Sequence, residues 1–519
     1  MGTEQRALPG VDLAAGDGAP SATAGDGAKR KPRLKAVDRE QLLLRTVDVE
    51  SLVPEDHPAR AVWELVGKLD LGLYLEQVQS VEGAAGRPAL DPRLLLSLWV
   101  YSYSRGVSSA RAIERLCSHD PGYQWLTGME VISAHTLSDF RVAHGKALSE
   151  LFQQVLGVLS AHGLITLERV MLDGTRIRAC AASSGFRTRQ RIKEHLKAAK
   201  KLVKELEQQS DEEASKQQTR ARKRAAHERM ERLESALKQF EELEANKSQA
   251  ERVSTTDPEA RVMKLPEGGS GACYNVQIAT DAKHSLIVDV DVTQAGSDYR
   301  QLTPAMDRIE ANRASLPTQV VVDGGYISNS NIVDMAERGI DLIGPERDKK
   351  ASAQSADKWY AYWGVHPDYE WSKFKYDADT NTCVCPQGKR LKYDAKTVRD
   401  GTTRYRYKAL MTDCQACPVK NLCCPRTRGG RSIERTELLP AVIAYRAKVQ
   451  TDGAKAIYRT RSQVAEFPNL WIKAKHCLRQ FRVRGLEKVR IESRWSALTY
   501  NIQHWIRLCW LPRTSPSAA

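Results

Sequence analysis

The stretch that decides the fold is residues 170–182, Val-Met-Leu-Asp-Gly-Thr-Arg-Ile-Arg-Ala-Cys-Ala-Ala. Its apolar beginning, residues 170–172, predicts a short buried strand, and Asp173-Gly174 predicts a turn at the end of that strand. A carboxylate at the mouth of a core strand is costly to bury unless a basic side chain or a divalent cation meets it. Asp173 is therefore the first candidate functional residue.

The same pattern returns at residues 319–322, where a second apolar run ends in Asp323-Gly324-Gly325-Tyr326. Further strands are predicted at 274–279, 286–292 and 341–344, with a hairpin connection at 280–284 and a helix at 299–311. The order strand, strand, strand, helix, strand, helix, strand describes a mixed sheet with helices beside it.

The two aspartates point at one volume of space if their strands are neighbours. Two close carboxylates repel each other unless a cation lies between them, so Asp173 and Asp323 predict a divalent-metal site. The alternative is that each aspartate only starts a turn.

Composition favours a polyanionic partner. The 519 residues include 79 Lys and Arg against 64 Asp and Glu, a net charge of +15, which favours nucleic acid over a small neutral ligand. General solubility is the alternative explanation of the charge. Apolar runs are too short to span a bilayer and the first residues lack a signal-peptide apolar segment, so we expect a cytoplasmic protein.

The chain before the opening stretch divides into an arm and a helical region. Residues 1–36 are rich in Gly, Ala, Asp and Pro and end in basic residues, which predicts a disordered basic arm. Residues 37–164 have apolar positions at helical spacing, with helix starts at Asp91-Pro92 and Ser108-Ser109. This predicts a helical DNA-binding domain. Its candidate DNA-facing residues are Arg105, Arg111, Arg115 and Arg141, and an ordinary solvated face is the alternative.

Two insertions are predicted in the sheet region. Residues 187–257 contain no Gly or Pro and carry apolar residues at heptad-like spacing, which predicts a helical hairpin turning near Ser210-Asp211. Its mixed charges are typical of a solvated or partner-facing surface. Residues 346–440 contain six of the 11 cysteines. Their spacing suits a tetrahedral zinc site formed by Cys385, Cys414, Cys417 and Cys423, with free buried thiols as the alternative.

The C-terminal part, residues 441–510, predicts helices at 454–473 and 488–507. Basic residues interleaved with rings, among them Tyr458, Phe467, Trp471 and Phe481, suit a surface that follows a phosphate backbone. Glu466 lies within this cationic stretch. It either pairs with a neighbouring basic side chain or completes, with Asp173 and Asp323, a site for two Mg²⁺ ions about 3.5–4 Å apart. Glu492 is the rival third carboxylate.

Several motifs together carry a resemblance to a known family. They are Leu172-Asp173-Gly174-Thr175, Ser254-Thr255-Thr256-Asp257-Pro258, Tyr274-Asn275-Val276-Gln277, Gly296-Ser297-Asp298, Val322-Asp323-Gly324-Gly325-Tyr326 and the stretch 458–473. From about residue 50 to 508 the chain resembles the DDE transposases of bacterial insertion sequences. Residues 52–164, with Asp56-His57-Pro58, Asp91-Pro92-Arg93 and the run Gly106-Val107-Ser108-Ser109-Ala110-Arg111, are similar to the InsH-type N-terminal domain of that family.

The resemblance implies an α/β ribonuclease-H-like catalytic core, divided into residues 165–186 and 258–345 by the hairpin, with a tail at 511–519. It implies Asp173, Asp323 and Glu466 as catalytic ligands of two Mg²⁺ or Mn²⁺ ions. The family's C-terminal signature of Tyr, Arg, Glu and Lys matches Tyr458, Arg461, Glu466 and Lys473, although four residues separate Arg461 from Glu466 where three are usual. The DNA-binding residues are then Tyr458, Arg461, Lys473, Arg479, Arg484 and Arg111.

The expected function is cleavage of transposon ends at their terminal inverted repeats and joining of those ends to target DNA. We expect a nucleoid-associated protein that forms a homo-oligomer on DNA. Two alternatives remain open at this point. One is a nuclease of the same fold without strand transfer, and the other is a catalytically inactive DNA-binding protein.

Overall fold

The structure is a computed structural model that describes residues 46–80, 88–208, 216–245, 252–265, 267–346, 358, 360–399 and 402–514. The predicted basic arm and the predicted hairpin turn at Ser210-Asp211 lie outside these residues. Within them, no helix is both long and apolar enough to cross a membrane.

The region before the opening stretch is helical, as predicted. Asp91 caps one helix by accepting a hydrogen bond from the Arg93 N–H, with Pro92 in the first position. A second helix begins after Ser109, but the Ser109 hydroxyl makes no capping bond. The helices are α1 (Pro58–Val66), α2 (Gly72–Leu75), α3 (Pro92–Ser104), α4 (Ala110–Cys117), α5 (Pro121–Thr127), α6 (Ala134–Ala143) and α7 (Gly145–Ala161), after the 3₁₀ turn η1 (Glu50–Leu52).

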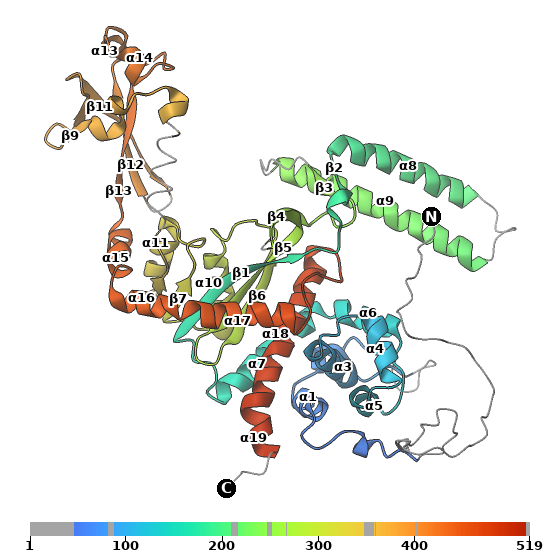
Figure 1. Ribbon diagram of the computed structural model, residues 1–519. Helices are drawn as coiled ribbons and strands as arrows, with labels where there is room; N and C mark the ends of the chain where they lie inside the picture. Colours follow the sequence, from blue (N-terminus) through green and yellow to red (C-terminus); the bar gives the residue numbers. More distant parts are fainter. Residues whose placement is uncertain are drawn as a thin grey trace, which may run out of the picture. The chain divides into compact units, whose positions relative to one another are not determined.

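A mixed six-stranded sheet follows, in the order β4-β5-β1-β7-β8 with β6 also paired to β5 (Figure 1). Strand β5 is antiparallel to β1, β4 and β6, whereas β1, β7 and β8 are parallel. The prediction of a mixed sheet is thus confirmed, and the strands that carry the two aspartates are neighbours. The elements are β1 (Arg169–Arg178), β4 (Arg261–Lys264), β5 (Ser270–Asp281), β6 (Leu286–Thr293), α10 (Leu302–Arg313), β7 (Gln319–Val322), α11 (Asn329–Glu337) and β8 (Asp341–Ile343).

One local prediction in the opening stretch is wrong. No turn forms at Asp173-Gly174, because β5 continues to pair with β1 beyond that point, with Asp173 opposite Ile278 and Gly174 opposite Gln277. A pairing partner far along the chain therefore overrides the local turn signal. At Asp323 the prediction is confirmed: β7 ends at Val322, and the Asp323 carboxylate accepts a hydrogen bond of 2.7 Å from the Gly325 N–H.

Two long helices, α8 (Arg189–Gln208) and α9 (Lys216–Ala245), lie side by side (Figure 1). Ile192 and Leu196 of α8 share a hydrophobic cluster with Leu233 and Phe240 of α9. The short strands β2 (Phe186–Arg187) and β3 (Val253–Ser254) pair antiparallel at the base of the two helices. We call α8 and α9 the helical hairpin.

A separate antiparallel sheet with the order β13-β12-β11-β10-β9 forms the cysteine-rich lobe, residues 360–438 (Figure 1). Its small core contains Phe374, Leu391, Tyr407 and Ile433. The elements are η3 (Pro367–Tyr369), η4 (Trp371–Lys373), β9 (Lys375–Asp377), β10 (Thr382–Val384), β11 (Arg390–Arg399), β12 (Thr402–Ala409), α13 (Met411–Gln415), α14 (Lys420–Cys423) and β13 (Ser432–Leu438).

The C-terminal helices return to the main core. Helix α17 contacts β1 and β5, and α18 contacts α3, α6, α7 and β6, so the N-terminal helices and the sheet share one hydrophobic core. The predicted tail begins with a helical turn, α19. The elements are α15 (Pro440–Lys448), α16 (Asp452–Arg459), α17 (Arg461–Ala474), α18 (Leu486–Trp505), the π-helical turn η5 (Ile506–Trp510) and α19 (Leu511–Thr514).

Candidate active site

The pairing register brings two of the three predicted carboxylates together. Strands β1 and β7 run parallel, and Leu172 lies opposite Val322. Asp173 follows Leu172 and Asp323 follows Val322, so the two aspartates occupy equivalent positions. Parallel neighbours present equivalent positions at the same edge of the sheet. Glu466 comes from α17, the helix that contacts β1.

All three carboxylates meet at the guanidinium of Arg461. Its Nη2 lies 2.7 Å from Asp173 Oδ1 and 4.0 Å from Asp323 Oδ2, and its Nη1 lies 3.8 Å from Glu466 Oε1. The side chains differ in exposure, at 14% for Asp173, 39% for Asp323 and 60% for Glu466. We call these three residues the acidic cluster. Arg461 is buried and compensates the charge of this cluster, and its contact with DNA stays a prediction.

Asp173 is the most constrained member of the cluster. Its second carboxylate oxygen accepts a hydrogen bond of 2.8 Å from Asn469 Nδ2, and its first accepts one of 3.0 Å from the Gly174 N–H. Burial raises the pKa of Asp173 to about 6, while the charge of Arg461 opposes that rise and the charge of Asp323 adds to it. The hydrogen bonds therefore hold Asp173 in place, whereas its burial disfavours the ionised carboxylate unless a cation lies close to it.

A polar network lies behind Gly174. Asp298 accepts hydrogen bonds of 2.7 Å from both Asn275 and Gln277, and Gln277 accepts one from the Tyr326 hydroxyl. A Cβ atom at Gly174 would lie 2.5 Å from Asp298 Oδ1, so glycine is required for this close approach. Three of the motifs that carry the family resemblance thus form one hydrogen-bonded support beside the motif that contains Asp173.

Sequence reasoning assigned no functional role to Asn469 or Asp298. For the support network a signal was present, because Asn275 and Gln277 alternate along β5 and so face the same side of the sheet. No comparable signal marks Asn469, whose role depends on how α17 packs against β1.

The donor set suits a hard divalent cation. Carboxylate and amide oxygens are preferred by Mg²⁺, and the Asn469 Oδ1 atom beside Asp173 is buried without a hydrogen-bond partner within the described chain. Among the described residues, however, no three His, Cys, Asp or Glu side chains adopt metal-binding geometry. In the acidic cluster, Arg461 interacts with the same oxygens that a cation would use.

The other predicted DNA-binding residues have separate locations. Tyr458 packs against a small cluster with Met171, Val321 and Ile343, so its ring supports the sheet. Lys473 is half-buried, which lowers its pKa, while the charges of Glu267 and Asp173 oppose that shift. Arg479 and Arg484 are exposed next to the end of β1, where Arg178 donates its N–H to the Arg479 carbonyl. Arg111 is exposed on α4.

One of the four arginines predicted to face DNA is buried. Arg141 is 8% exposed and its Nη1 lies 3.7 Å from Glu492 Oε1, so the prediction for Arg141 is wrong. Arg105 lies 3.8 Å from Asp120, whereas Arg115 is exposed. The ion pair with Arg141 places Glu492 between α6 and α18. Glu492, the rival third carboxylate, therefore lies outside the acidic cluster.

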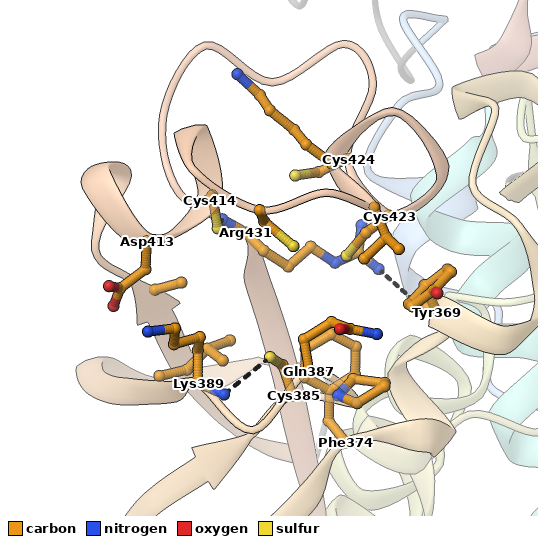
Figure 2. Close-up of a pocket in the computed structure, with 16 residues that line it drawn as sticks. Tyr369, Phe374, Cys385, Gln387, Lys389, Asp413, Cys414, Cys423, Cys424 and Arg431 are labelled. Atoms are coloured by element: carbon orange, nitrogen blue, oxygen red, sulfur yellow. Dashed lines mark hydrogen bonds between the residues drawn. The ribbon is translucent and has the colours of Figure 1, made fainter.

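The cysteine-rich lobe contains a cavity of about 30 Å³ lined by Cys385, Cys414, Cys417 and Cys423, the four predicted zinc ligands, and by Cys424. Figure 2 shows Cys385 across this cavity from Cys414 and Cys423, with the Arg431 side chain beside them. Backbone N–H groups of Lys389 and Arg431 donate to the sulfurs of Cys385 and Cys414 at 3.2 and 3.3 Å. A hydrogen bond from Cys423 lowers the pKa of Cys424, and the charge of Arg431 adds to that shift.

Two family models match the chain. The family described as Transposase domain (DUF772) matches residues 47–143, and the family described as Transposase DDE domain matches residues 384–506. These two matches indicate an insertion-sequence DDE transposase. The DDE match contains Glu466 and Arg461, whereas Asp173 and Asp323 lie between the two matched segments. No curated protein and no solved structure matches the chain.

The two family matches bear on the substrate and on the metal ions that the protein uses. A DDE transposase acts on DNA, and the family generally uses divalent metal ions such as Mg²⁺. The excess of basic residues in this transposase agrees with a polyanionic substrate.

Proposed function

We propose that this transposase cleaves the ends of its element and joins them to target DNA, with Asp173, Asp323 and Glu466 as the catalytic residues. One observation carries the proposal, which is the convergence of these three side chains on the Arg461 guanidinium. They come from β1, from the end of β7 and from α17, so their meeting is a property of the fold rather than of local sequence.

We assign the core to the ribonuclease-H-like fold. The support is the strand order, in which an antiparallel group of β6, β5 and β1 continues into the parallel strands β7 and β8. The helical hairpin and the cysteine-rich lobe are then insertions in that core. This assignment explains why the first carboxylate lies inside β1 and the second directly after β7.

In the mechanism, the acidic cluster would hold two Mg²⁺ or Mn²⁺ ions. Bound there, the ions would supply activation of the attacking oxygen, from water and later from a DNA 3′-hydroxyl, and stabilisation of the leaving oxygen during in-line attack. Asn469 and the Gly174 N–H orient Asp173, and Arg461 balances the three negative charges when no cation is bound. No covalent intermediate with the protein is required.

Basic residues outside the acidic cluster would contact the DNA. Lys473, Arg479 and Arg484 would hold the backbone of the transposon end, and the N-terminal helices, with Arg111 exposed, would help recognise the terminal inverted repeats. A homo-oligomer would bring two ends together, in the bacterial cytoplasm and on the nucleoid.

A strand-transfer assay tests the proposed reaction. We expect purified protein, Mg²⁺, a duplex with the element's own terminal sequence and a supercoiled plasmid to give covalent products in which a 3′ end is joined to the plasmid. Cleaved ends without joined products would favour a nuclease of the same fold. Binding without any metal-dependent nicking would show a catalytically inactive DNA-binding protein.

We further propose that the cysteine-rich lobe binds a structural zinc ion through Cys385, Cys414, Cys417 and Cys423, whose side chains would have to draw together because they form no metal-binding group within the described chain. A cavity of about 30 Å³ exceeds the space that one water molecule needs. Thiolates are the usual ligands of structural zinc, and the N–H donors on Cys385 and Cys414 suit negatively charged sulfurs. The lobe has a small core, so a metal would add stability that packing alone does not supply.

Elemental analysis of the purified full-length protein is expected to find one zinc per chain. Replacing Cys414 with serine should remove the zinc and lower the melting temperature of the lobe. The matched control is Cys180→Ser, because Cys180 lies outside the lobe. Absence of zinc at stoichiometric level in the unmodified protein would leave free thiols as the correct interpretation.

A further inference from the structure

A strongly basic cavity lies where the helical hairpin joins the rest of the transposase. Its volume is about 330 Å³, and four arginines line it: Arg187, Arg229, Arg232 and Arg484. His195 and the two threonines of the Ser254-Thr255-Thr256-Asp257-Pro258 motif add polar groups. Within the described part of the chain, no aspartate or glutamate lines the cavity. Four positive charges therefore face one small volume.

Residues distant in the sequence are fixed around this cavity. The pairing of β2 with β3 places Arg187 opposite Val253, and the Thr255 N–H donates to the Gly185 carbonyl at 3.1 Å. Arg229 and Arg232 are three residues apart on α9, so they project from the same face of that helix. The backbone before α18, which carries Arg484, is held because the Gly485 N–H donates to the buried Asp257 carboxylate at 3.2 Å.

The charges in the cavity are poorly compensated. Arg187 donates to the carbonyls of Ser184 and Phe186, so these contacts fix its guanidinium group without neutralising it. Arg484 donates to the Cys180 carbonyl, and the charge of the buried Asp257 balances its charge in part. Arg232 lies 3.9 Å from Glu228, but both side chains are more than a third exposed, and such pairs contribute little.

Ion pairs between the same two helices are different. Arg189 lies 2.9 Å from Glu244, and Lys200 lies 2.9 Å from Glu234. The helical hairpin thus provides close acidic partners for these basic residues, whereas at the cavity the described ion pair is the longer, exposed one between Arg232 and Glu228. Like charges held together repel one another, so an anion bound among them is stabilised.

We propose that this cavity binds a phosphodiester group of the DNA backbone and so makes the helical hairpin a DNA-binding element. Guanidinium groups form paired hydrogen bonds with phosphate oxygens, and threonine hydroxyls also contact phosphates in protein–DNA complexes. The proposal rests on DNA being the substrate but not on the acidic cluster. It gives the hairpin, predicted from sequence as a solvated or partner-facing surface, a contact that is independent of base sequence.

The test is a double variant in the full-length protein, Arg229→Gln with Arg232→Gln. Fluorescence anisotropy with a random-sequence duplex should show affinity weaker on the order of tenfold, because removing each charge-assisted hydrogen bond weakens binding severalfold or more. The slope of log affinity against log salt should become shallower by about 1 for each phosphate that the variant no longer binds. Melting temperature and helix content should remain unchanged.

The matched control is Arg220→Gln with Arg222→Gln, which removes the same charge from exposed positions of α9 that do not line the cavity. Equal loss of affinity in both double variants would show a general charge effect and overturn the proposal. Unchanged DNA affinity, together with loss of thermal stabilisation by inorganic phosphate, would assign the cavity to a free anion and also overturn it. The Asp173 variant discussed below should retain this binding, so failure here is distinguishable from failure of the catalytic proposal.

Discussion

Replacing Asp173 with asparagine is expected to abolish metal-dependent DNA cleavage, with a rate loss of ~10³-fold or more. Asp173 is the carboxylate closest to Arg461, at 2.7 Å, and the member of the acidic cluster that is fixed by Asn469 and the Gly174 N–H. Removing a ligand that positions a catalytic cation removes several kcal/mol of transition-state stabilisation, and each 1.36 kcal/mol is about tenfold in rate.

Folding and DNA binding should survive this change. Asparagine has nearly the same shape as aspartate, and burial already disfavours the charge at this position, since it raises the pKa of Asp173 to about 6. The matched control is Asp307→Asn, because Asp307 pairs with Arg338 on the surface of α10 and its side chain is 55% exposed. Anisotropy with duplex DNA should give equal affinities for both variants. Isothermal titration with Mn²⁺ should show weaker metal binding only for Asp173→Asn.

Cleavage by the Asp173 variant at a rate near that of the Asp307 variant would remove Asp173 from the mechanism. A loss of DNA affinity in parallel with cleavage would instead indicate that Asp173 supports the fold. The two measurements together therefore separate a catalytic role from a structural one.

The arrangement of strands β1 and β7 could be predicted because it depends on the pattern of apolar residues. Two apolar runs that each end in Asp-Gly, with helices between the later strands, indicate neighbouring strands and so adjacent carboxylates. What the pattern could not show is that β1 continues through Asp173 to Arg178, because the pairing partner of that segment lies about a hundred residues later in β5.

The roles of individual arginines were the least predictable part of the site. The sequence does not distinguish Arg461 and Arg141 from Arg479 and Arg111, since all four lie in cationic, polar segments. Burial separates them, and burial follows from the packing of α17 on β1 and of α18 on α6, contacts between elements far apart along the chain. Sequence periodicity describes one element at a time and does not show which face of a second element will cover it.

Replacing Glu492 with alanine is expected to lower the free energy of unfolding by about 3–5 kcal/mol. Glu492 is fully buried, accepts a hydrogen bond of 2.9 Å from the Arg482 N–H and lies 3.7 Å from Arg141. Arg141 also donates to the Ser108 carbonyl and lies over the Trp99 ring. Alanine would leave the Arg141 charge buried without its carboxylate, in the core shared by α3, α6 and α18.

Urea denaturation measures this loss, and hydrogen exchange of peptides from α3 and α18 should show the local opening. The matched control is Glu487→Ala on the same helix, where the side chain is exposed and the expected loss is below about 1 kcal/mol. Equal losses for the two variants would show that the buried pair is not important for stability.

Glu492→Gln separates the charge from the hydrogen bond. Burial raises the pKa of Glu492 above its value in the unfolded chain, although Arg141 opposes the rise. The contribution of Glu492 to stability is therefore fully present below the unfolded pKa and declines as pH rises through the folded pKa. Glutamine can still accept the bond from Arg482 and does not titrate, so we expect a smaller loss than for alanine and a flatter stability profile between acidic and neutral pH. A profile as steep as that of the unmodified protein would assign the pH dependence to other buried carboxylates.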